Sequence, residues 1–186
     1  PPEIGKLNKL KKFYLQNNYI SFIPSEIGML NKLTELNMQN NKIIKLPSEI
    51  GMLKILEILN FSNNLLVKIP SKISQLKMLN ELNLNNNQLK YLPSEFGELN
   101  NLEKLFLSHN NLSNIPSEIG KLTNLKVLHL NNNNLENIPS EYGQFVNLED
   151  FNLHSNLLKN IPSENLNLKK LKKLDISYNN IEEIPS

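Results

Sequence analysis

The sequence contains no cysteine, tryptophan, arginine or alanine, and its only aspartates are Asp150 and Asp175. Without cysteine, the chain can form no disulfide, no thiolate metal site and no cysteine nucleophile. The absence of cysteine also favours a reducing, intracellular compartment. No apolar run approaches the length of a membrane span and no signal peptide opens the chain, so we expect a cytoplasmic protein with no membrane insertion. Because the chain starts at Pro1 rather than at Met, a removed leader stays an open alternative.

An excess of charge of one sign is lacking too, since 20 lysines stand against 18 acidic residues and give a net charge of +2. Such a balance produces no strong electrostatic footprint for DNA, RNA or an anionic membrane, and we expect no nucleic-acid partner. Aromatic residues make up 6% of the chain, whereas leucine and isoleucine are abundant, so the core should be aliphatic.

What the sequence does contain is a strict repeat. Prolines recur every 23 residues, at positions 1, 24, 47, 70, 93, 116, 139, 162 and 185. A fixed period of about 20–29 residues is typical of solenoid proteins, in which stacked units bury a shared core. Each unit follows the pattern P-S-E-I-G-x-L-x-x-L-x-x-L-x-L-x-x-N-x-L-x-x-I.

The repeated apolar positions predict two short elements in each unit. The L-x-L step has the period of a strand and should place both apolar side chains in the core, as at Leu36 and Met38. The P-S-E-I-G segment should form a 3₁₀ or short α turn, with Ser as its cap and Glu at its positive end. Neither element can bury its apolar face alone, so the units must stack. After Pro162, Asn165 replaces the usual Ile, and we expect a locally altered turn there.

One asparagine recurs at the same phase in every unit, just after the strand. Its amide offers two donors and one acceptor, enough to bridge backbone groups of neighbouring turns beside the core. We therefore interpret these residues as a structural ladder. In the run from Asn131 to Asn134, only Asn133 holds this phase, and its neighbours are interpreted as surface residues. The ladder comprises Asn18, Asn41, Asn64, Asn87, Asn110, Asn133, Asn156 and Asn179.

On these motifs, the chain resembles the leucine-rich repeat family over all eight units. The resemblance implies an α/β fold, a curved solenoid with a parallel β-sheet on the concave face and short 3₁₀ or α turns on the convex face. The P-S-E-I-G version is similar to intracellular repeat proteins that scaffold small GTPases of the Ras type, including their plant relatives. We expect residues 1–186 to form a single domain of eight 23-residue units. No polar capping unit is visible at either end, which indicates a fragment of a longer protein.

Function should lie at the variable positions of the concave strands, because the repeated positions explain the fold. Amides dominate these positions in the second to fourth units, whereas aromatic, aliphatic and histidine side chains appear in the last four. Large apolar groups on an exposed face and aromatic anchors are typical of binding sites. The opposing interpretation is a set of ordinary surface side chains. We predict a partner-binding patch formed by Phe106, His109, Val127, His129, Asp150, His154 and Tyr178.

The three histidines of this face are not predicted to bind a metal or to catalyse. Strand spacings place the backbones of neighbouring histidines roughly 8–11 Å apart, which would strain a shared zinc site. Neither aspartate is expected in register beside a serine and a histidine, as a catalytic triad requires. The chain has no glycine-rich phosphate loop either, and we expect no enzyme activity, no cofactor and no metal.

The leading hypothesis is a rigid protein-interaction module or scaffold in signalling, with a protein partner such as a small GTPase. The first alternative is a regulatory or recognition domain of a larger enzyme or receptor whose catalytic part lies outside this chain. The second alternative is self-association of the array through its uncapped ends. The fold alone does not choose among these functions.

Overall fold

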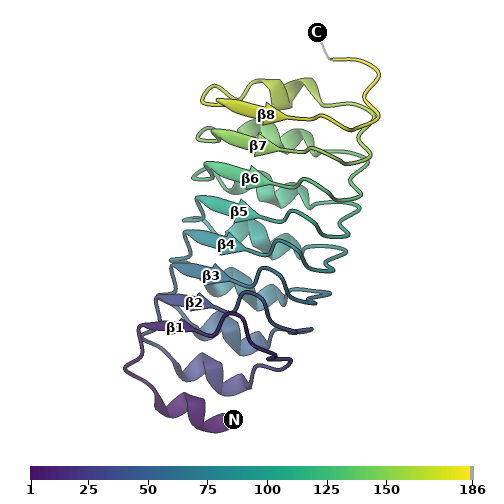
Figure 1. The fold of residues 1–186 in the computed structure, drawn as a ribbon. Helices are drawn as coiled ribbons and strands as arrows, with labels where there is room; N and C mark the ends of the chain where they lie inside the picture. The colour runs from purple at the N-terminus through teal and green to yellow at the C-terminus, as the bar shows by residue number, and fades with distance from the viewer. Residues whose placement is uncertain (185–186) are drawn as a thin grey trace.

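The protein is a stack of eight parallel strands that form one open sheet in chain order (Figure 1). The computed structural model describes residues 1–184, so Pro185, the last proline of the repeat, lies outside the described residues. Corresponding residues of neighbouring units are paired, so that Leu36 lies beside Leu59 and Leu59 beside Leu82. This arrangement confirms the predicted leucine-rich repeat solenoid. The strands are β1 (Lys12–Tyr14), β2 (Glu35–Asn37), β3 (Ile58–Asn60), β4 (Glu81–Asn83), β5 (Lys104–Phe106), β6 (Val127–His129), β7 (Asp150–Asn152) and β8 (Lys173–Asp175).

A 3₁₀ helix precedes each strand and packs against the helices of the neighbouring units behind the sheet (Figure 1). The predicted serine cap is wrong. Pro24 occupies the N-cap position of the second helix, and the hydroxyl of Ser25 donates to the carboxylate of Glu26 (3.1 Å) instead of capping the backbone. The helices are η1 (Pro2–Lys6), η2 (Ser25–Met29), η3 (Ser48–Met52), η4 (Ser71–Gln75), η5 (Ser94–Glu98), η6 (Ser117–Lys121), η7 (Ser140–Gln144) and η8 (Ser163–Leu166).

Both apolar side chains of the L-x-L step lie in the core, as predicted. Leu36 is fully buried and Met38 is 3% exposed. This burial depends on the units on both sides, because Leu174 in the last strand is 37% exposed whereas Leu82, at the same position of an interior strand, is fully buried. Stacking is therefore what removes the apolar surface of each unit from water.

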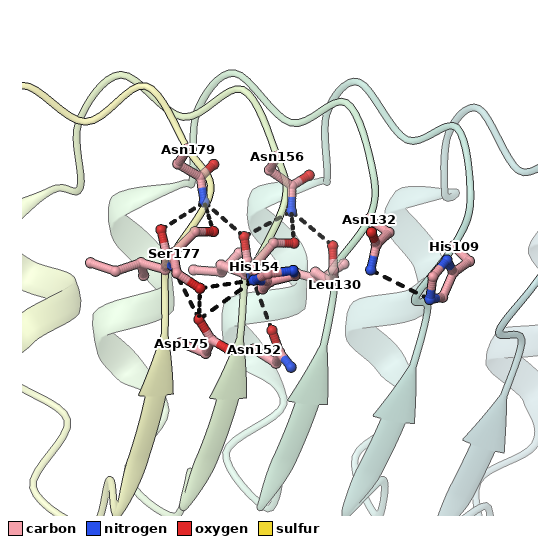
Figure 2. A network of polar contacts seen from close by, with 11 residues as sticks. His109, Leu130, Asn132, Asn152, His154, Asn156, Asp175, Ser177 and Asn179 are labelled. Carbon is pink, nitrogen blue, oxygen red and sulfur yellow. Dashed lines mark hydrogen bonds and ion pairs between the residues drawn. The ribbon is translucent and has the colours of Figure 1, made fainter.

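Each interior ladder asparagine links two adjacent units through its side-chain amide. Nδ2 of Asn110 donates to the carbonyl oxygens of Leu107 in its own unit (3.1 Å) and Leu84 in the preceding unit (3.0 Å). Its Oδ1 accepts from the backbone N–H of Leu89 (3.0 Å). Figure 2 shows the same donor geometry at Asn156. The amide thus satisfies polar backbone groups that the turn would otherwise leave unpaired beside the core.

The residue before each ladder asparagine takes the left-handed backbone conformation, with φ between 52° and 60°. Asparagine tolerates this conformation better than most residues, and it fills the position in five of the eight units. Asn132, a neighbour of Asn133 that was interpreted as a surface residue, is half-buried and also serves the turn with its φ of 56°. In the other three units, His109, Ser155 and Tyr178 adopt this conformation.

The helices of the convex face approach one another closely at the repeated glycine. A Cβ at Gly120 would lie 2.5 Å from the backbone oxygen of Glu141 in the next unit, so a larger residue would force the units apart. The last helix departs from the pattern, as predicted, because η8 has four residues instead of five. Asn165 is buried there, and its Nδ2 donates to the carbonyl oxygen of Pro139 (3.2 Å).

Candidate partner-binding site on the concave face

The last residue of each strand contributes to one row of side chains across the concave face. In five units an asparagine or aspartate of this row accepts a hydrogen bond from the backbone N–H two residues later, at 3.0–3.1 Å. Phe106 cannot make this bond, and neither Tyr14 nor His129 makes it within the described residues. The row consists of Tyr14, Asn37, Asn60, Asn83, Phe106, His129, Asn152 and Asp175.

Phe106 and His129 lie side by side in this row, on β5 and β6. Their ring centroids are 5.2 Å apart and their planes make an angle of 74°. Edge-to-face geometry of this kind is favourable for aromatic pairs. Val127 begins the strand that His129 ends, on the same face, and all three side chains are half-buried. Together they form an apolar surface that exists before any partner binds.

Asp150 places a carboxylate at the edge of this apolar surface. It is in register with Val127 and Lys173, and its Oδ2 lies 3.4 Å from Nε2 of His129 and 3.7 Å from Nζ of Lys173. Among the described residues, His129 Nε2 and Asp150 Oδ1 are buried polar atoms without a hydrogen-bond partner. Such atoms are uncommon, and here two of them lie in neighbouring strands. We call Phe106, Val127, His129 and Asp150 the concave apolar cluster.

A second cluster lies where the chain leaves β7 and β8, at the turn side of the face (Figure 2). The hydroxyl of Ser177 donates to Oδ1 of Asp175 (2.5 Å), and its oxygen lies 2.8 Å from Nδ1 of His154. Because the hydroxyl hydrogen goes to Asp175, Nδ1 of His154 is the donor to Ser177. The ring of Tyr178 meets the His154 ring at 4.9 Å between centroids. These four residues, His154, Asp175, Ser177 and Tyr178, form the His154 cluster.

The carboxylate of Asp175 is stabilised in its charged form. The hydrogen bonds from the hydroxyl and the backbone N–H of Ser177 lower the pKa of Asp175, and the nearby His154 and Lys173 add to the effect. Hydrogen bonds donated to a carboxylate favour its ionised state. The cluster therefore presents a negative charge beside an exposed aromatic ring.

The expectation that neither aspartate lies beside a serine and a histidine is wrong. Asp175 ends β8 and Ser177, two residues later, donates to it, and the 23-residue register brings Ser177 next to His154. The order of the groups nevertheless differs from a catalytic triad, in which the histidine lies between the serine and the carboxylate. Here the serine is in the middle, and Nδ1 of His154 is 3.9 Å from Asp175. The hydroxyl of Ser177 donates its hydrogen bond to Asp175 and not to the histidine.

The predicted patch is thus two clusters and one separate residue. The concave apolar cluster and the His154 cluster contain six of the seven predicted side chains. His109 lies apart, exposed in the turn after β5, with its Nε2 3.4 Å from Nδ2 of Asn132 (Figure 2). Tyr178 occupies the same turn position and is 80% exposed, so both residues lie at the margin of the sheet instead of on a strand.

Three residues that lie next to the predicted side chains were not themselves predicted as site residues from the sequence, namely Lys173, Asp175 and Ser177. The signal that identifies them is the repeat itself, because residues 23 apart become neighbours in the sheet, as Asp150 and Lys173 do. Within residues 1–184, no group of three or more His, Cys, Asp or Glu side chains could hold a metal ion. In the same range, no helix is long and apolar enough to cross a membrane.

Comparisons with known proteins agree with the fold. A family model described as a leucine-rich repeat region matches residues 1–87 and 35–131, and a leucine-rich repeat model matches residues 124–145 and 170–186. Among curated proteins, none matches the chain significantly. A leucine-rich repeat protein of Leptospira interrogans is 38% identical, with a TM-score of 0.92, and the match covers 100% of this chain and 47% of that protein.

Two further solved structures are plant receptors. The plant peptide hormone receptor RGFR1, in complex with RGF2, is 32% identical over 96% of this chain and 30% of its own length, with a TM-score of 0.88. The leucine-rich repeat ectodomain of the receptor kinase GASSHO1/SCHENGEN3 from Arabidopsis thaliana, in complex with Casparian strip integrity factor 2, is 30% identical, with a TM-score of 0.71. That match covers 99% of this chain and 26% of the ectodomain chain. The chain therefore spans less than half the length of each of these three structures.

Proposed function

Because the chain belongs to the leucine-rich repeat family, we propose that it is a protein-interaction module whose concave face binds a protein or peptide partner. The two plant receptors are described as complexes, one with RGF2 and one with Casparian strip integrity factor 2, which supports binding as the task of this fold. The proposed site is the concave apolar cluster. The His154 cluster extends it toward the turns, and His109 lies at its rim.

The observation that carries this proposal is the interruption of the amide row. At the row position, asparagine or aspartate holds the strand end by a local hydrogen bond in five units. Phe106 and His129 do not form that bond; on this half-buried face they contact each other, and His129 also lies near the carboxylate of Asp150. Residues that break a local structural rule are expected at functional sites.

The geometry also indicates how binding would work. The aromatic pair and Val127 offer an apolar anchor, and Asp150 and Lys173 beside it offer one charge of each sign. The sheet holds these groups in place through its ladder, so little conformational entropy is lost on binding. A partner with an apolar side chain flanked by a hydrogen-bond donor would complement the partly exposed carboxylate of Asp150.

A pull-down from lysate, read by mass spectrometry, tests the proposal with three baits. They are the native chain, the Phe106→Ala/His129→Ala variant, and a control, Gln16→Ala/Gln39→Ala, on the same face outside the cluster. We expect a partner that the native chain and the control capture and the site variant does not. Circular dichroism establishes that all three baits are folded. Equal capture by all three baits would exclude the concave apolar cluster as the site.

The finer parts of the hypothesis stay predictions. Signalling with a small GTPase predicts that purified Ras-type GTPases bind the native chain and not the site variant. A cytoplasmic location predicts that the tagged parent protein stays in the cytosolic fraction. We also propose that residues 1–186 act as one recognition domain, which predicts a single cooperative unfolding transition.

The alternative is a regulatory or recognition domain within a larger enzyme or receptor. Two of the structural relatives are receptors, which supports this alternative. If the native chain captures no partner but the full-length parent does, the recognition domain of a larger protein becomes the better explanation.

A further inference from the structure

A second exposed apolar surface lies away from the concave face, along one edge of the solenoid. The edge is formed by the segments between each ladder asparagine and the next proline, which follow the strands (Figure 1). After β1 to β4, these segments expose Tyr19 (84%), Phe22 (74%), Ile44 (51%), Val67 (40%) and Tyr91 (52%). We call residues 19–23, 42–46, 65–69 and 88–92 the apolar edge.

The same positions after β5 and β6 are polar and make a natural contrast. The residues aligned with Ile44 and Val67 are Ser113 and Glu136, and those aligned with Phe22 are Asn114 and Asn137. The repeat therefore does not require apolar side chains here. Burial does not explain these apolar side chains either, because they are exposed, and other residues of the same segments form the core.

The apolar edge contains a groove of about 540 Å³. Its walls include Phe22 and Ile44, and its floor includes Leu46 and Ile69, which are 2% and 4% exposed. The lysines Lys45 and Lys68 line it as well. An apolar floor with charged walls fits a side chain whose neighbours carry the opposite charge.

The charge around the groove is basic. Lys42, Lys45, Lys68 and Lys90 all belong to the apolar edge and are exposed, and none forms an ion pair with a carboxylate within residues 1–184. On the adjacent helix, Lys72 occupies the position that holds glutamate in the other seven helices. The one acidic residue that lines the groove is Glu49, whose carboxylate accepts from the hydroxyl of Ser48 (3.1 Å).

We propose that the apolar edge is a second binding site, for an extended acidic peptide segment of another protein that carries one or two large apolar side chains. The apolar side chains would enter the groove, and the flanking carboxylates would pair with the lysines. A second copy of the chain is a poorer occupant. Edge-to-edge contact of the same halves would oppose lysines, and contact with the other half would place apolar groups against Ser113 and Asn137.

The site is tested by selecting a random 12-residue phage-displayed peptide library on the immobilised native chain. We expect enriched peptides to combine aspartate or glutamate with large apolar residues, and not lysine or arginine. Fluorescence anisotropy then measures the affinity of a labelled, selected peptide for variants of the chain. Ile44→Ser/Lys68→Glu should weaken binding about tenfold or more, since it removes an anchor and reverses a rim charge.

The matched control is Leu157→Ser/Lys159→Glu, which makes the same kinds of change on the far half of the same edge, where Leu157 is 43% exposed. It should leave the affinity unchanged. Lys72→Glu restores the usual residue of the repeat, so this variant should fold normally. Its affinity for the selected peptide should be a few-fold lower, and binding should depend less on salt. The Phe106→Ala/His129→Ala variant should bind the selected peptide normally, which separates this site from the concave one.

Three results would overturn the proposal. The first is a selection that enriches no peptide, or peptides without an excess of acidic residues. The second is equal affinity of the selected peptide for the native chain and the Ile44→Ser/Lys68→Glu variant. The third is a concentration-dependent dimer in light scattering that this variant abolishes, because that result would assign the apolar edge to a second copy of the chain.

Discussion

Replacing an interior ladder residue, as in Asn87→Ala, should destabilise the protein strongly. Nδ2 of Asn87 donates to the carbonyl oxygens of Phe61 (3.0 Å), Leu84 (3.1 Å) and Asn85 (3.2 Å). Its Oδ1 accepts from the buried backbone N–H of Leu66 (2.9 Å). Alanine keeps none of these four hydrogen bonds, and the loss occurs where the side chain is only 7% exposed.

The backbone groups that bond to the side chain of Asn87 differ in whether they keep another hydrogen bond after its removal. The carbonyl oxygen of Phe61 still accepts from Nδ2 of Asn64 (3.1 Å), and that of Leu84 still accepts from Nδ2 of Asn110 (3.0 Å). The N–H of Leu66 has no second acceptor within the described residues, so it becomes a buried unpaired donor. A group of this kind costs about 1–3 kcal/mol, and the weakened carbonyl contacts and the small cavity add about 1 kcal/mol. We expect a total of about 3 kcal/mol.

Urea denaturation followed by circular dichroism measures this loss. With a typical slope of about 2 kcal/mol/M, a loss of about 3 kcal/mol lowers the midpoint by about 1.5 M. The matched control is Asn18→Ala in the first unit. Asn18 is exposed, and its amide donates only within its own unit, to Leu15 and Gln16. The control should cost less than about 1 kcal/mol. If the two variants lose the same stability at equal slopes, the ladder does not act between units as we argue.

Three further predictions follow from the same contacts. Gly120→Ala should cost about 1–3 kcal/mol in urea denaturation, because its Cβ would meet the backbone of the next unit; an unchanged midpoint would contradict that close approach. Burial raises the pKa of Tyr142 well above its ordinary value, and its hydroxyl donates to the carbonyl of Pro116 (3.3 Å). The Tyr142 hydroxyl therefore ionises at lower pH in the unfolded chain than in the folded protein, so the free energy of unfolding should fall as pH rises above about 10. Tyr142→Phe should reduce this alkaline loss of stability, as measured in denaturation curves. Equal losses in the two proteins would be evidence against burial of the hydroxyl. Ser177→Ala should raise the pKa of Asp175, since the Ser177 hydroxyl is the main cause of its low pKa, and carbon-13 NMR titration of the carboxylate measures this change; an unmoved pKa would exclude the hydrogen bond.

The period of the sequence was sufficient to predict most of the fold. A residue and its equivalent 23 positions later must become neighbours in a stack, so the strand register follows directly, as in the pairing of Leu59 with Leu82. The apolar L-x-L step indicated which side chains lie in the core because strand alternation is a property of the backbone. Departures such as Asn165 were also informative, since a polar residue at a core position must alter the local turn.

Features that depend on the path of individual turns could not be predicted in the same way. The left-handed conformation of Asn132 follows from the direction in which the chain leaves the strand, and composition does not reveal it. For the same reason His109 and Tyr178 were assigned to the strand face although they lie in turns. The contact of Ser177 with His154 follows from the 23-residue period, but it was not predicted because it joins two neighbouring units.

In a repeat protein, each unit serves as a structural reference for the others. Phe106 and His129 replace a side chain that forms a local hydrogen bond in five other units, and Lys72 replaces a glutamate present in seven. Neither departure fills the buried core, because the first lies on a half-buried face and the second is exposed. The first lies beside the half-buried Val127, and the second belongs to the helix that follows the edge segment with the exposed Val67. Stability alone therefore does not explain these residues, and we propose that two separate binding surfaces do.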